Sequence, residues 1–91
     1  MTVFVEFTKS FDKRAWQLCK KNPQLKTVLI KQFSVFRNNP YYPSLRLHKL
    51  RGDRSEQFAI WIMGDLRALS IKSKTQKNTY IFFDLVSHDE Y

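Results

Sequence analysis

The sequence has little of several residue types that often define small proteins. Its single cysteine, Cys19, excludes an intramolecular disulfide, and its two histidines are too far apart to form a Cys/His cluster with zinc spacing. It has two glycines and no glycine-rich phosphate loop. No apolar run approaches the roughly 18–20 residues that a membrane span needs. We therefore expect a chain folded by one modest hydrophobic core, without a metal or other cofactor.

Acidic residues are absent from a long part of the chain. None occurs between Asp12 and Asp53, whereas ten lysines and arginines do, and the net charge of the whole chain is +8. A surface this one-sided attracts a polyanion or an acidic protein. The charge balance alone therefore favours a nucleic-acid or acidic-protein partner over a role in solubility only.

The N-terminal residues lack the basic start and apolar centre of a signal peptide. We therefore expect a cytoplasmic protein that does not bind membranes. Hydrophobic residues make up 43% of the chain and aromatic residues 15%, which is enough for a packed core in a chain of 91 residues. We expect residues 1–91 to form a single domain.

The first half of the chain predicts a strand and two helices. Residues 3–7 alternate as a strand does. Ser10 is a candidate N-cap for a helix that ends near Lys21, and Asn22-Pro23 is a typical start for a second helix that ends near Arg37. Apolar side chains recur at helical spacing in both segments, and Cys19 belongs to the first of these stripes. We expect both stripes to face the core, with the lysines largely off them.

The second half predicts four strands. They cover residues 45–50, 58–62, 67–72 and 79–86, and a polar turn at residues 52–55, the pair Gly64-Asp65 and a polar loop at 74–78 separate them. The resulting order is β-α-α-β-β-β-β. We expect an α+β fold in which two N-terminal helices pack on one face of a mostly antiparallel sheet of roughly five strands.

The register of the hairpin at Gly64-Asp65 decides which side chains meet. A two-residue loop would place Arg67 opposite Ile62, whereas a three-residue loop that includes Met63 would place it opposite Trp61. We favour the second register. It puts Ala59, Trp61, Arg67 and Leu69 on one face and turns Ile60, Ile62 and Ala68 toward the helices.

Three residues suit RNA cleavage without a metal. That reaction needs a base for the 2′-OH, a cation for the charge on phosphorus and an acid for the leaving 5′-oxygen. Histidine suits both proton transfers, and the planar guanidinium of arginine suits the phosphate. Arg67 therefore suits the phosphate, and His48 and His88 suit the proton transfers. Each of the three also has an interpretation without a catalytic role. His48 would be a half-exposed strand histidine, His88 an exposed residue of a frayed terminus, and Arg67 a surface arginine beside the hairpin or paired with Asp65.

Other residues near these three have weaker signals. Tyr91 can stack on a base or donate a proton, and turn chemistry explains Asp65 fully. Trp61 cannot transfer a proton but can stack on a base. Arg46, Lys49, Arg51 and Arg54 are candidate RNA-backbone contacts.

The second half of the chain resembles the RelE/ParE superfamily of bacterial toxins, and within it the YafQ-like mRNA interferases. The shared residues are Pro43-Ser44-Leu45-Arg46, His48-Lys49-Leu50, Gly52, Gly64-Asp65, Arg67 and His88-Asp89-Glu90 with Tyr91. The chain departs from the pattern at two places. Relatives often carry a basic residue where Trp61 stands, and many have one more residue between the Glu and the Tyr of the last motif.

The resemblance implies a toxin of a type II toxin–antitoxin system. The YafQ-like activity would be ribosome-dependent cleavage of mRNA by 2′-OH attack, without a metal and with His48, Arg67 and His88 as catalytic residues and Asp65 as a candidate. The implied partners are the ribosome, mRNA and a cognate antitoxin, which we expect to be acidic and partly disordered. Two alternatives stay open: a ParE-like inhibitor that binds DNA gyrase, and an inactive member that only binds an antitoxin or nucleic acid.

Overall fold

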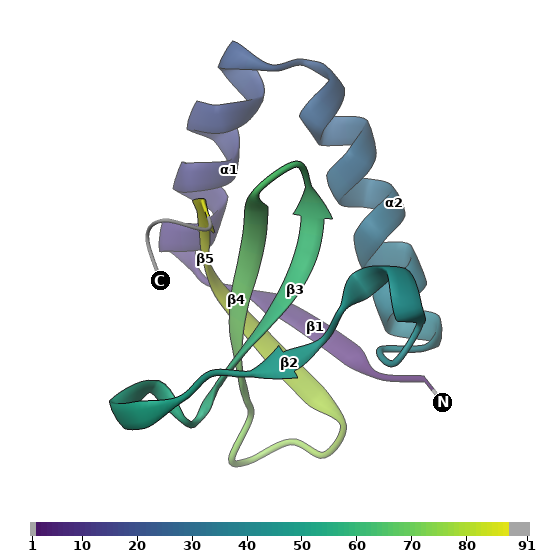
Figure 1. The fold of residues 1–91 in the computed structure, drawn as a ribbon, viewed down its shortest axis with the longest axis vertical. Coiled ribbons are helices and arrows are strands. Elements are labelled where there is room, and N and C mark those ends of the chain that lie inside the picture. The colour runs from purple at the N-terminus through teal and green to yellow at the C-terminus, as the bar shows by residue number, and fades with distance from the viewer. Residues whose placement is uncertain (1, 88–91) are drawn as a thin grey trace.

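The computed structural model describes residues 2–87, which form two helices and a sheet (Figure 1). Two short 3-10 turns, Pro43–Leu45 and Gly52–Arg54, flank the second strand. The elements are, in chain order, β1 (Phe4–Phe7), α1 (Lys9–Lys21), α2 (Gln24–Asn38), β2 (His48–Lys49), β3 (Gln57–Met63), β4 (Leu66–Lys72) and β5 (Thr79–Ser87).

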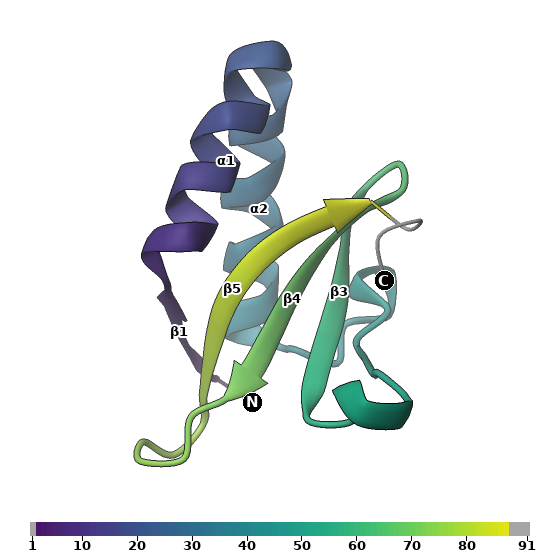
Figure 2. The same ribbon diagram turned by 90° about the vertical axis from the view of Figure 1, so that its left-hand side faces the viewer.

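The strands form a five-stranded sheet in the order β1-β5-β4-β3-β2. All neighbours are antiparallel except β1 and β5, which pair in parallel from Phe4 opposite Thr79 to Phe7 opposite Phe82. Both helices stand on the same side of β3, β4 and β5 (Figure 2). The predicted α+β architecture is therefore confirmed.

Aromatic side chains dominate the core between the helices and the sheet. The rings of Phe33 and Phe82 lie 4.8 Å apart between centroids, edge to face, and Phe36 meets Phe82 at 5.4 Å. Edge-to-face contacts of this kind add to the gain from burying the rings. The predicted inner stripes of both helices contact this core, with Cys19 among them.

The first helix begins earlier than expected. Thr8, rather than Ser10, is the N-cap, and its hydroxyl accepts a hydrogen bond from the backbone N–H of Phe11. Ser10 instead donates its hydroxyl proton to the carbonyl of Phe83 on β5, at 3.0 Å. The prediction failed because both residues are good caps and only the contact with β5 separates them.

The predicted second strand is also shorter than expected. Only His48–Lys49 pairs with β3, and Pro43 instead begins a 3-10 turn whose Leu45 is fully buried. The turn ends at Arg46, which has a left-handed backbone with a φ of 51°. Leu45 is therefore buried in the main core, and this burial favours a turn where the local sequence predicted a strand.

Neither helix within residues 2–87 combines the length and the apolar character that crossing a bilayer requires.

Candidate functional site

Three of the candidate residues, His48, Trp61 and Arg67, lie on the face of the sheet that the helices leave uncovered. His48 on β2 pairs with Ala59 on β3, and Ala59 pairs with Leu69 on β4, so the three side chains share this face. Ala59 and Leu69 form a small buried cluster there with Val86. We call this side of the sheet the second face. Its apolar cluster supports the polar side chains around it.

The β3–β4 hairpin places Arg67 opposite Trp61, as predicted. The route to this register differs from the expectation. The turn contains only Gly64 and Asp65, with Met63 paired to Leu66, and a bulge at Ile62 supplies the extra residue. Gly64 has a φ of 54°, which a residue without a side chain adopts easily. Bulges of this type redirect side chains and are frequent beside active sites.

Trp61 and Arg67 are held by the same carbonyl. The indole Nε1 of Trp61 donates to the Gly64 oxygen at 2.8 Å, and the guanidinium of Arg67 donates to the same oxygen at 3.3 Å. A second bond from Arg67, to the Leu66 oxygen, is 3.4 Å long. Both arginine bonds are long and therefore weak, and a phosphate would be a stronger acceptor.

His48 has a defined proton position. Its Nδ1 lies 2.9 Å from the carbonyl oxygen of Arg46. Because a carbonyl only accepts, Nδ1 is the donor, and the lone pair of the neutral ring lies on Nε2. Arg46, whose carbonyl contacts the imidazole, has a left-handed backbone. The guanidinium of Arg46 lies 5.8 Å from the centre of the Trp61 ring. The contact with the Arg46 carbonyl therefore helps to fix the orientation of the imidazole ring.

His48 and Arg67 lie two strands and one pleat apart on the second face. Strands about 4.8 Å apart and a rise of about 3.3 Å per residue put their Cα atoms roughly 12 Å from each other. An imidazole and a long guanidinium side chain can reach a common phosphate across this separation.

A hollow beside His48 is lined mainly by basic side chains. A shallow hollow of about 340 Å³ is lined by His48, Lys49, Leu50, Arg51 and Arg54. Three of these side chains are cationic, and Arg54 is fixed by a hydrogen bond from its Nε to Gln57. Of the predicted RNA contacts, Arg46 instead lies beside Trp61. The structure thus distributes positive charge on both sides of His48.

Two acidic residues belong to the strands and the turn that form the second face. Asp65 lies exposed in the hairpin turn. Asp84, which is not among the predicted site residues, pairs with Leu69 and so lies in the same row as His48. A bulge at Phe83 brings it there, and the break in alternation at Phe82-Phe83-Asp84 was the available signal. His88 and Tyr91 lie outside the described residues.

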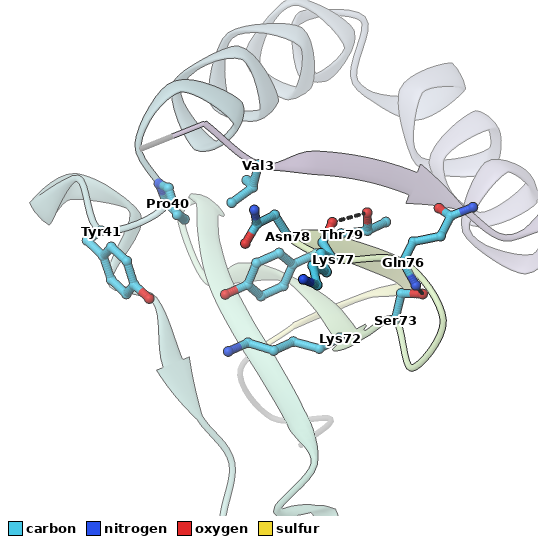
Figure 3. A pocket seen from close by; sticks show the side chains of 10 residues that line it. Val3, Pro40, Tyr41, Lys72, Ser73, Gln76, Lys77, Asn78 and Thr79 are labelled. Atoms are coloured by element: carbon cyan, nitrogen blue, oxygen red, sulfur yellow. Dashed lines mark hydrogen bonds between the residues drawn. The ribbon is translucent and has the colours of Figure 1, made fainter.

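A separate polar pocket lies at the other end of the sheet, beside the β4–β5 loop (Figure 3). It measures about 170 Å³, and its lining includes Tyr41, Lys72, Asn78 and Tyr80. Burial raises the pKa of the Tyr80 phenol, and the nearby Tyr41 raises it further. None of the candidate residues lines this pocket, so it is distinct from the site on the second face.

The site combines an imidazole, a guanidinium and an indole ring, which are side chains of the kinds that contact RNA. Residues 2–87 contain no group of three or more metal-ligating His, Cys, Asp or Glu side chains. An imidazole and a guanidinium offer proton transfer and electrostatic stabilisation.

No protein-family model and no curated protein matches the sequence. Solved structures do match the fold over almost the whole chain. The YoeB/ParE toxin from Agrobacterium tumefaciens superposes with a TM-score of 0.75 and 12% identity, covering 94% of this chain and 99% of that one. The RelBE2 toxin–antitoxin complex from Mycobacterium tuberculosis gives 0.74 and 18%, covering 96% and 99%. YafQ from E. coli gives 0.71 and 16%, covering 97% and 96%.

These similarities define the class of fold: a toxin-like α+β fold of the kind found in toxin–antitoxin systems. More particularly, the chain has the RelE/ParE fold, and its structural relatives include YafQ. The resemblance seen in the sequence is thus confirmed at the level of the fold.

Proposed function

We propose that this protein is the toxin of a type II toxin–antitoxin system and cleaves mRNA on the ribosome. The observation that supports this most directly is the shared face of His48, Trp61 and Arg67. In this proposal the phosphodiester lies across the three strands that carry these residues, β2, β3 and β4. The similar folds of the YoeB/ParE toxin, of the RelBE2 toxin–antitoxin complex and of YafQ support the same assignment.

The proposed reaction is an internal transfer within the RNA. Nε2 of His48 takes the proton of the ribose 2′-OH, and the 2′-oxygen bonds to the adjacent phosphorus. The bond from phosphorus to the 5′-oxygen breaks, and an acid returns a proton to that leaving oxygen. Arg67 stabilises the negative charge on the non-bridging oxygens. We assign the acid to His88, and the products are a 2′,3′-cyclic phosphate and a free 5′-hydroxyl.

The proposed partners follow from charge and from the small number of acid–base groups. The basic side chains around His48 suit RNA and the ribosome, which would position the mRNA. An acidic, partly disordered antitoxin would be attracted by the same surface and would block it. The similar M. tuberculosis structure is a toxin–antitoxin complex, which supports this kind of partner. Ribosomal mRNA would place the protein in the cytoplasm.

The test is inducible expression of the wild type, His48→Ala and Arg67→Ala, followed by growth, mRNA integrity and plasmid supercoiling. We expect the wild type to arrest growth and cleave mRNA, and both variants to lose at least about a hundredfold in cleavage rate. Equal circular-dichroism melting curves would show that the variants are folded.

The same experiment separates the alternatives. Growth arrest with intact mRNA and altered supercoiling would replace the nuclease assignment with gyrase inhibition. A soluble wild type that causes no arrest would indicate an inactive member that only binds its partner.

A further inference from the structure

A large hollow lies beside the candidate site, between α2 and the end of β3. It measures about 610 Å³, and its lining includes Val28, Gln32, Val35, Tyr42, Ser44 and Trp61. It exists because β2 pairs with β3 only at Phe58 and Ala59, so the outer edge of β3 has no strand beside it from Ile60 onward. Its volume is within the range of about 300–1,000 Å³ that is typical of small-molecule sites.

Gln32 occupies the open edge of β3. Its side chain is only 6% exposed, and Nε2 donates to the carbonyl oxygens of Trp61 at 3.3 Å and Ile62 at 3.0 Å. Because both partners are acceptors, the nitrogen of the amide faces the strand and Oε1 faces away from it. Within residues 2–87, Oε1 accepts no hydrogen bond. Gln32 therefore presents a fixed acceptor in an otherwise largely apolar hollow.

The walls of the hollow suit a flat aromatic ring attached to an anion. Trp61 is fixed by its bond to Gly64, and Tyr42, which is 49% exposed, is a second ring in the lining. Lys31 also lines the hollow, and Arg46 lies against Trp61. Gly64 accepts from both Trp61 and Arg67, so one carbonyl links the ring to the arginine proposed to hold the phosphate.

We propose that this hollow binds one unstacked nucleobase of the RNA substrate, next to the phosphate that is cleaved. The base stacks on Trp61, and an N–H on its edge donates to Oε1 of Gln32. The cationic side chains of Arg67 and Lys31 contact the phosphates on either side of this base. This proposal rests on the function proposed above, because it assigns a base-recognition role to the edge of the same site. Stacking on a fixed ring is the usual way in which proteins hold single-stranded bases.

The first test fills the hollow without touching the proposed catalytic residues. Ser44→Trp places a large ring at an exposed lining position, and Ser34→Trp places the same ring at an exposed position of α2 outside the hollow. We expect Ser44→Trp to bind a short single-stranded RNA at least about tenfold more weakly than the wild type, by fluorescence anisotropy. Ser34→Trp should bind as the wild type does. Equal RNA affinities for the two variants, both with wild-type melting curves, would overturn the proposal.

The second test uses nucleotides and requires neither cleavage nor the ribosome. Trp16→Phe removes the other tryptophan, which is exposed on α1, and leaves Trp61 as the fluorescent reporter. We expect AMP to quench Trp61, and N6,N6-dimethyl-AMP, which stacks but lacks the N–H donor, to bind several-fold more weakly. Absence of quenching by both nucleotides, or equal affinity for the two, would overturn the proposed base recognition.

These tests separate the hollow from the nuclease function. If the wild type and Ser44→Trp cleave mRNA in a translation extract and bind short RNA equally well, base binding in the hollow is overturned and the nuclease function stands. If the wild type leaves mRNA intact, the nuclease function fails, and the AMP titration still decides whether a base binds. Loss of antitoxin binding by Ser44→Trp with unchanged RNA affinity would show that a protein segment occupies the hollow, and would overturn the proposal.

Discussion

The two faces of the sheet differ in what their side chains contact. Toward the helices, β3, β4 and β5 present fully buried apolar residues such as Ile60, Ala68 and Phe82. On the second face, the buried cluster is small, and His48, Trp61 and Arg67 are only partly buried or exposed. Since side chains alternate along a strand, neighbouring residues of one strand point to opposite faces. A substitution on the helix-covered face should therefore lower the free energy of unfolding, and one on the second face should lower activity. Five changes test this difference.

The largest effect should come from the helix-covered face. Phe82 is fully buried, and its ring meets those of Phe33 and Phe36. Phe82→Ala should lower the free energy of unfolding by about 3–5 kcal/mol, because it removes these contacts and leaves a cavity. Urea denaturation would measure this change. The control is Phe4→Ala, which removes a ring that is 65% exposed and should cost less than about 0.5 kcal/mol. Similar losses for the two variants would contradict the comparison.

The next effect should come from the boundary between the two faces. Gln32→Leu keeps most of the side-chain volume but removes both hydrogen bonds to the β3 bulge. We expect a loss of about 1–3 kcal/mol in the free energy of unfolding, because the carbonyls of Trp61 and Ile62 lose their donor. Gln24→Leu, at an exposed position of the same helix, is the matched control. An unchanged urea midpoint for Gln32→Leu would mean that other donors bind the carbonyl oxygens of Trp61 and Ile62.

A gain in stability should come from Ser70. This residue of β4 is fully buried, and its hydroxyl has no hydrogen-bond partner among the described residues. Ser70→Ala should raise the free energy of unfolding by about 1 kcal/mol, because an unsatisfied polar group is removed. Ser73→Ala should have the opposite sign, since the Ser73 hydroxyl accepts from the N–H groups of Thr75 and Gln76. A loss of stability in Ser70→Ala would point to a partner for the hydroxyl.

A pH-dependent effect should come from Tyr80. Its pKa is raised by burial and by Tyr41, so the folded state keeps the phenol proton to a higher pH than the unfolded state does. The contribution to stability is complete below the unfolded pKa of about 10 and is lost as the pH rises through the folded pKa. Between pH 9 and pH 11, the urea midpoint of the wild type should therefore fall by more than that of Tyr80→Phe. Parallel slopes would rule out this linkage.

The smallest change in stability should accompany the largest loss of function. Arg67 makes only two long hydrogen bonds. Arg67→Ala should shift the free energy of unfolding by less than about 0.5 kcal/mol yet abolish growth arrest, and Arg67→Lys should restore only part of it because the forked geometry is lost. Urea denaturation and colony counts after induction would measure both. A variant that unfolds as easily as Phe82→Ala would show that the second face is also needed for stability.

Much of this fold was predictable because its signals are local. The helical stripes predicted which side chains of α1 and α2 pack inward, and strand alternation predicted the faces of Ile60, Trp61 and Arg67. The cap at Thr8 and the turn that ends at Arg46 were missed. In both cases a contact with a distant strand or with the core decided between two locally acceptable conformations.

The sequence by itself determined the two helices, the alternation of the strands and the excess of positive charge, because each of these depends on residues close together in the chain. Only the folded chain shows the bulge at Ile62 and the burial of Gln32 against the open edge of β3. Gln32 lies 29 and 30 residues before its partners Trp61 and Ile62 in the chain, and no local pattern encodes which backbone groups such distant contacts satisfy or leave unpaired.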